Sequence, residues 1–87
     1  MREVIEETTQ GTLGAVDVGV ANLWPRAWPG EGAAEQLTAR VAWLVEGQQR
    51  WELVAVGTTL EIGGLRWRVE AIDKAPAALG RVTFVRE

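Results

Sequence analysis

Few side chains in this chain of 87 residues could carry chemistry, because the sequence contains no His, Cys, Ser or Tyr. Acyl transfer by a Ser or Cys nucleophile is therefore excluded, as is base catalysis by imidazole. Zinc sites built from Cys and His are excluded for the same reason. The Gly63-Gly64 pair lacks the third spaced Gly and the following helix of a phosphate-binding loop. We expect no catalytic residue, no cofactor and no metal site.

Asp17 is the acid of most interest, because it lies within an apolar run. It could act as a catalytic acid or as one ligand of a hard cation. The simpler interpretation is that Asp17 faces water on the polar side of its strand, since unpaired charges are seldom buried. We keep it as a candidate binding residue. Two acids flanking a cleft, as glycoside hydrolysis needs, are not expected in so small a domain.

The segment from Trp24 to Gly32 predicts a loop, because two Trp-Pro pairs favour extended or turn geometry and Pro cannot donate to a strand ladder. Trp24, Arg26 and Trp28 are candidate partner-binding residues, since Trp and Arg dominate interface hot spots. The Trp faces could also stack on a sugar or a flat ligand. We favour a third interpretation, in which the loop folds back and caps an open end of a barrel, because exposed paired Trp promotes aggregation.

The other three Trp residues are predicted to be core. Trp43, Trp51 and Trp67 lie on alternating apolar segments, where large aromatic side chains are usually buried. Arg66 and Arg68 alternate with Leu65 and Trp67, which predicts a solvated strand face. Pairing of these arginines with Glu52 or Glu61 across the ladder would add only a few tenths of a kcal/mol.

The elements that must position these residues are arranged around the stretch from Trp51 to Asp73. Two runs that alternate with a period of two are joined there by Gly63-Gly64. Such a pair is a strong hairpin signal, because tight primed turns need positive φ at their central positions.

Further strands are predicted on both sides of this hairpin. Residues 2–8 predict an edge strand, 9–11 a turn, and 12–24 one alternating strand with a bulge or bend at Gly14 and Gly19. Residues 33–46 fit both a helix and a strand. We favour a strand from Leu37, since the turn at 46–49 would pair it with 50–56. Residues 74–80 predict a loop that could hold one helical turn, and 81–86 the last strand.

The fold class that follows is all-β: a small antiparallel β-sandwich or partly closed β-barrel of about six to seven short strands, in one domain of residues 1–87. The net charge of −3 and the interspersed charges argue against nucleic-acid binding. No apolar stretch reaches the ~20 residues of a membrane span. The absence of Cys and of a signal-like N-terminus predicts a cytoplasmic protein.

One block of the sequence resembles a known group of proteins. The block Val56–Val69, read VGTTLEIGGLRWRV, is similar to a Gly-Asp-Thr-Phe-x-Val-Gly-Gly-x-x-Trp-x-Val segment in small β proteins of actinobacteria and other GC-rich bacteria. Gly11-Thr12, Val18-Gly19-Val20 and Asn22 resemble their first half. Thr58 replaces the usual Asp, and the Trp-Pro loop is an addition. The resemblance implies an all-β fold and a bacterial origin, and it carries no activity.

These observations lead to a non-catalytic interaction or structural module. It would bind a protein partner, or itself as a homo-oligomer, through a sheet edge or the Trp24–Trp28 loop. The alternative is a small barrel that binds an apolar ligand or templates a cyclisation without acid or base residues. A subunit of a bacterial assembly and an acidic immunity-type inhibitor remain open as well.

Overall fold

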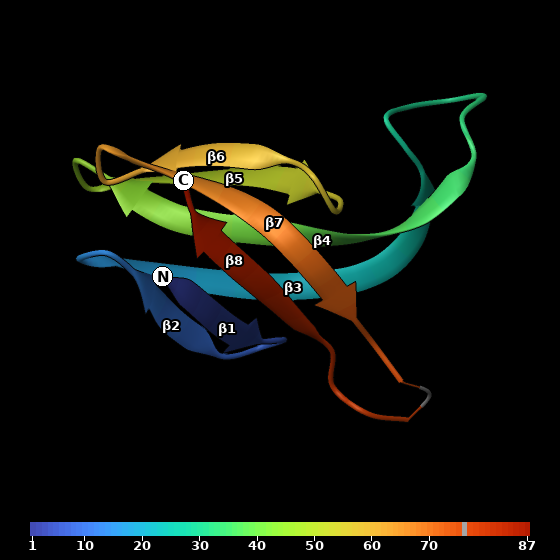
Figure 1. Ribbon diagram of the computed structural model, residues 1–87, viewed down its shortest axis with the longest axis horizontal. Helices are drawn as coiled ribbons and strands as arrows, with labels where there is room; N and C mark the ends of the chain where they lie inside the picture. The colour runs from blue at the N-terminus through green and yellow to red at the C-terminus, as the bar shows by residue number, and fades with distance from the viewer. Residues whose placement is uncertain (76) are drawn as a thin grey trace.

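The computed structural model describes residues 1–75 and 77–87, which form two antiparallel sheets of four strands each (Figure 1). The first sheet has the order β1-β8-β7-β6 and the second the order β2-β3-β4-β5. The strand bounds are β1 Arg2–Glu6, β2 Gln10–Leu13, β3 Val16–Ala27, β4 Glu35–Val45, β5 Gln48–Val54, β6 Thr59–Ile62, β7 Leu65–Asp73 and β8 Arg81–Arg86. The predicted all-β fold is therefore confirmed, and none of the described residues forms a helix long and apolar enough to cross a membrane.

The predicted number of six to seven strands is wrong, because the region 9–24 holds two strands. A turn at Gly14-Ala15 separates β2 from β3, and Leu13 pairs with Val16 across it. Gly14 has φ +63°, a conformation that glycine adopts at little cost. The turn expected at 9–11 lies two residues earlier, at Glu7–Thr9, so that Gln10 already belongs to β2.

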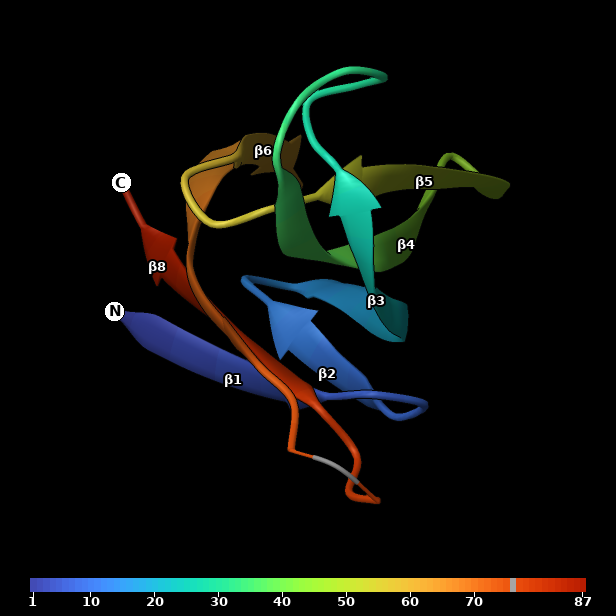
Figure 2. The same ribbon diagram turned by 90° about the vertical axis from the view of Figure 1, so that its right-hand side faces the viewer.

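The Trp-Pro segment is mostly strand. β3 continues to Ala27, where Trp24, Pro25 and Arg26 pair with β4, and the loop is confined to residues 28–34. A bulge between Ala21 and Trp24, with Asn22 at φ +55°, bends the strand before this extension. The loop projects away from both sheets in Figures 1 and 2. The predicted loop from Trp24 to Gly32 is therefore correct for residues 28–32 and wrong for residues 24–27, and the loop does not fold back over the sheets as a cap.

Several turn predictions are confirmed. Gly63 and Gly64 have φ +62° and +78° and join β6 to β7 in a two-residue hairpin. The predicted turn at 46–49 is shorter, because Glu46 and Gly47 alone join β4 to β5 and Gln48 already belongs to β5. The ambiguous segment 33–46 is a strand from Glu35 to Val45. β8 forms over the predicted residues, and β1 lies at a sheet edge as predicted but ends at Glu6 instead of Thr8. The predicted loop 74–80 contains Pro76, which lies outside the described residues.

The core fills the space between the two sheets, with Trp67 and Phe84 among its largest fully buried side chains. On one side of the molecule β1 of the first sheet lies beside β2 of the second (Figure 2). On the other side β5 and β6 diverge around an open hollow of about 570 Å³, which Trp43 and Leu60 help to line. The two sheets therefore do not close into a barrel, which bears on the second of the two predicted architectures, a sandwich or a partly closed barrel.

Candidate interaction surface

The outward face of the first sheet is covered with charges of both signs. Partners in register share a side of a sheet, so this face carries the charged residues Arg2, Glu6, Glu61, Arg66, Arg68, Asp73 and Arg81. Arg2 binds Glu70 at 2.8 Å, and Arg68 lies 3.6 Å from Glu87. The predicted solvated face at Arg66 and Arg68 is confirmed. Alternating charges of this kind keep a sheet face in water.

The outward face of the second sheet is different, because it is poor in charge and rich in apolar and small side chains. We call it the binding face. The register places these residues on it: Gln10, Thr12, Asp17, Gly19, Ala21, Trp24, Arg26, Gln36, Thr38, Arg40, Ala42, Leu44, Gln49, Trp51 and Leu53. Leu44, Trp24 and Trp51 are 62%, 64% and 52% exposed. Large apolar side chains gathered on one face typically mark a binding surface.

A shallow groove runs along the middle of the binding face. Gly19 of β3 pairs with Ala42 of β4, and a side chain built on Gly19 would meet no atom within 4 Å. Two adjoining hollows of about 490 and 360 Å³ share this pair, together with Gln10 and Gln49. The groove exists because the central side chains are small while those of β2 and β5 on either side are longer.

Trp51 lies on the binding face beside this groove and not in the core, so its predicted burial is wrong. The turn at 46–47 fixes the register, which places Arg50 opposite the inward-facing Trp43 and turns Trp51 outward. The guanidinium carbon of Arg40 lies 4.5 Å from the centre of the Trp51 ring. This cation–π contact favours the position of the guanidinium over the exposed ring. The predicted burial of Trp43 and Trp67 is confirmed.

The sequence-predicted site residues lie along β3 and its loop. Trp24 and Arg26 share the binding face, beyond the bulge, while Asp17 is exposed and lines one end of the groove. The Arg26 guanidinium donates to Thr38 Oγ1 and, at 3.3 Å, to the carbonyl of Asn22. The Arg26 side chain therefore stabilises the bulge in β3. Trp28 is partly buried, and its backbone N–H donates a hydrogen bond of 3.2 Å to the Ala34 carbonyl across the loop.

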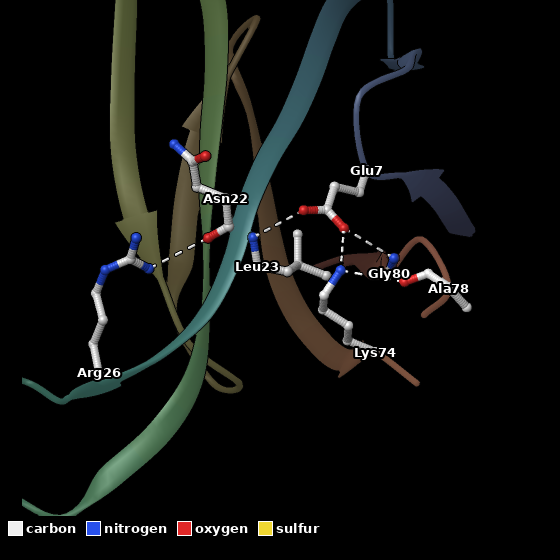
Figure 3. A network of polar contacts seen from close by, with 7 residues as sticks. All are labelled: Glu7, Asn22, Leu23, Arg26, Lys74, Ala78 and Gly80. Atoms are coloured by element: carbon white, nitrogen blue, oxygen red, sulfur yellow. Dashed lines mark hydrogen bonds and ion pairs between the residues drawn. The ribbon is translucent and has the colours of Figure 1, made fainter. Parts of the chain in front are cut away.

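The most connected polar group is Glu7, which the sequence pattern did not single out (Figure 3). Its carboxylate accepts hydrogen bonds from Lys74 Nζ at 2.8 Å, Gly80 N–H at 3.1 Å and Leu23 N–H at 3.4 Å. Lys74 also donates to the Ala78 carbonyl at 3.2 Å. All these partners belong to the chain itself, so the network joins the β1–β2 turn to β3 and to the β7–β8 connection. Its role is structural.

These contacts predict a loss of stability in acid. The bond from Lys74, followed by that from Gly80, lowers the pKa of the Glu7 carboxyl below its ordinary value of 4.5. Its contribution to folding is therefore fully present above pH 4.5 and is lost as the pH falls through the lowered pKa of the folded state. We expect Glu7→Gln to destabilise the protein by about 1–2 kcal/mol at neutral pH and to flatten the acid limb of stability against pH.

Urea denaturation between neutral and acid pH measures this effect, with Glu35→Gln on the exposed start of β4 as the matched control. An unchanged acid limb in Glu7→Gln, or an equal flattening in Glu35→Gln, would contradict it.

The described residues bring no three acidic side chains together at a distance that would hold a metal ion. Sequence reasoning missed the groove and the Arg40–Trp51 pair. The pair could have been found from the 46–47 turn, since counting outward from it places Ala42 opposite Trp51, with Arg40 two residues along on the same side of the sheet. Comparison with known proteins found no matching family model, no matching curated protein and no matching solved structure.

Proposed function

We propose that the protein is a non-catalytic interaction module that binds a protein partner on the binding face of its second sheet. The observation that carries the proposal is the contrast between the two outward faces. One is covered with alternating charges, and the other exposes Leu44 and Trp51 beside a groove and Trp24 farther along the same face. Trp and Arg held in place by their neighbours are typical anchors of protein interfaces. The packing of the sheets is sandwich-like.

The shape of the groove favours an extended segment of the partner. It follows the strand direction, with Asp17 at one end and Arg40 near the other. A partner segment that lies in it would place a basic side chain near Asp17 and an acidic one near Arg40, because opposite charges set the orientation of a bound chain. The floor of Gly19 and Ala42 lets the backbone of that segment approach closely.

The filled interior favours this proposal over an enclosed apolar ligand. Trp67, Phe84 and the side chains packed around them occupy the space between the sheets. The absence of His, Cys, Ser and Tyr from the sequence is in keeping with a binding role. We further propose a bacterial origin, on the resemblance of residues 56–69, and a cytoplasmic location, on the absence of Cys.

The test is capture of partners from a lysate of the source organism with immobilised protein and two matched variants. Ala42→Arg places a long charged side chain on the floor of the groove. Val4→Arg places the same side chain on the outward face of the first sheet, where Val4 is 52% exposed. We expect the native protein and Val4→Arg to retain the same protein and Ala42→Arg to lose it by at least tenfold in affinity, about 1.4 kcal/mol.

Equal retention by Ala42→Arg, or retention that fails only in Val4→Arg, would contradict the proposal. The captured protein is then produced alone and titrated against the three forms, so that the difference in affinity is measured between two purified components.

A further inference from the structure

The edge strand β5 has no strand partner on its outer side among the described residues. It ends the order β2-β3-β4-β5, and its seven residues, Gln48–Val54, make it the longest of the four edge strands. The other edges, β1, β2 and β6, have five, four and four residues. Proteins usually shorten, cover or bend an exposed edge, because its free N–H and C=O groups pair readily with another strand. β5 has neither a proline nor a bulge.

β1, the second longest of the edge strands, is less accessible for pairing with another strand. β1 lies beside β2 on the closed side of the molecule (Figure 2). Its Arg2 side chain is held by Glu70 through two hydrogen bonds of 2.9 and 3.1 Å. β5, by contrast, borders the open hollow of about 570 Å³ that separates it from β6.

The sequence of β5, Gln-Gln-Arg-Trp-Glu-Leu-Val, is complementary to itself when two copies run antiparallel about Trp51. Each residue before Trp51 then lies opposite the residue that is equally far after Trp51 in the second copy. Arg50 faces Glu52 of the second copy, Glu52 faces its Arg50, and the two Trp51 side chains meet on the two-fold axis. Opposite charges and aromatic pairs directly across a ladder both stabilise a sheet. We propose that β5 pairs with β5 of a second copy of this chain, in this register.

Both sides of the new ladder are satisfied in this arrangement. Trp51 lies on the binding face, where Arg40 already holds its ring at 4.5 Å, so the aromatic pair is flanked by two guanidinium groups. Arg50 and Glu52 lie on the opposite side, at the mouth of the hollow between β5 and β6, and both are exposed in the single chain. No charge is buried without a partner.

Pairing of this kind follows the rule for two-fold interfaces, in which the same surface of each copy meets itself. It would join the second sheets of two copies into one sheet of eight strands, twice the four of one chain, and would place the two binding faces side by side. A single strand pair buries less than the ~1,200 Å² of a stable specific interface, so the dimer is expected to dissociate in the micromolar range. The inference concerns the edge of the sheet and goes beyond the proposed function of its face.

Sedimentation equilibrium of the purified chain over roughly 5–500 µM tests the proposal, this span being chosen to bracket a weak interface. We expect the mass to rise from the 9.5 kDa of one chain towards twice that value. Arg50→Glu places Glu opposite Glu52 twice, and Glu52→Arg places Arg opposite Arg50 twice. Each variant should weaken the dimer about tenfold, because like charges directly opposite one another destabilise a ladder.

Two further samples identify the register. The double variant Arg50→Glu with Glu52→Arg restores opposite charges in every pair and should dimerise again. An equimolar mixture of the two single variants should form a heterodimer, since its pairs are again of opposite sign. Arg66→Glu on β7 of the first sheet, the control for the change of charge, should dimerise as the native chain does.

A monomer at every concentration would overturn the proposal. Equal dimerisation of the native chain and both single variants would overturn it too, as would failure of the double variant and the mixture to recover. Circular dichroism of each variant establishes that it is folded. Ala42→Arg should still dimerise, so failure of the proposed function and failure of this pairing are distinguished.

Discussion

Replacing Trp67 with Ala is expected to lower the free energy of unfolding by about 3–5 kcal/mol, the usual cost of truncating a buried large aromatic side chain. The side chain is fully buried between the sheets and lies opposite Leu60 of β6 and Arg86 of β8. A domain of this size has roughly 4–13 kcal/mol of stability, so the substitution should remove a large part of it. Urea denaturation followed by circular dichroism measures the loss.

A second variant at the same position separates the volume of the ring from its polar group. The Nε1–H of Trp67 is buried without a hydrogen-bond partner. Trp67→Phe removes that unpaired donor and keeps most of the packed volume, so it should cost less than about 1.5 kcal/mol.

Trp24→Ala is the matched control for Trp67→Ala, since Trp24 is 64% exposed and its loss should change stability by less than about 0.5 kcal/mol. Equal effects of Trp67→Ala and Trp24→Ala would show that the core is not where the structure places it.

Gly80→Ala is expected to cost about 3 kcal/mol, at the upper end of the range for overpacking. A Cβ at this buried position would overlap the Leu23 side chain and lie 2.8 Å from the Asp73 carbonyl oxygen. The backbone at Gly80 cannot shift freely, because its N–H donates to Glu7 Oε1 and its carbonyl accepts the Glu7 N–H at 2.8 Å. Thermal unfolding with urea denaturation provides the measurement.

Gly19→Ala is the matched control, because a Cβ there meets no atom within 4 Å. Removing glycine from a strand interior should leave stability unchanged or raise it by up to about 1 kcal/mol. Equal destabilisation by the two substitutions would contradict the close packing of Gly80 against Leu23 and Asp73.

The parts of the fold that the sequence predicts are those set by local chemistry. Gly63-Gly64 and Glu46-Gly47 define two-residue turns, and each turn fixes the register of its hairpin. The strand at Leu37–Val45 follows from such a turn in spite of its helix-like spacing of apolar residues. Val18 and Val20 are buried as their alternation indicates.

The missed parts depend on contacts between distant segments or on how far the two sheets separate. Gly14-Ala15 forms a turn inside a run that alternates on both sides of it, so periodicity alone could not divide β2 from β3. Trp51 was predicted to be buried because it is large. The register instead gives the inward positions of β5 to Arg50 and Glu52, which stay hydrated because β5 and β6 diverge there. Composition cannot show that divergence.

The candidate site was predicted only in part. Trp24, Arg26 and Asp17 lie on the binding face because they belong to β3, and the loop that the structure forms, residues 28–34, contains only Trp28 of the four. The Arg26 guanidinium already donates hydrogen bonds to Thr38 Oγ1 and the Asn22 carbonyl at the bulge. The groove arises from two small residues, Gly19 and Ala42, on strands that become neighbours only through pairing. No motif in the sequence marks such a pair.

The most direct test of the interaction surface is a titration of the isotope-labelled protein with the captured partner, followed by NMR. The five Trp indole N–H signals report separately on the binding face, the loop and the core. We predict that the signals of Trp24 and Trp51 and the amides of Gly19 and Ala42 shift, while the Trp67 indole and the amides of Arg68 and Arg81 on the first sheet do not. Shifts that gather on the first sheet, with Trp24 and Trp51 unchanged, would contradict the account.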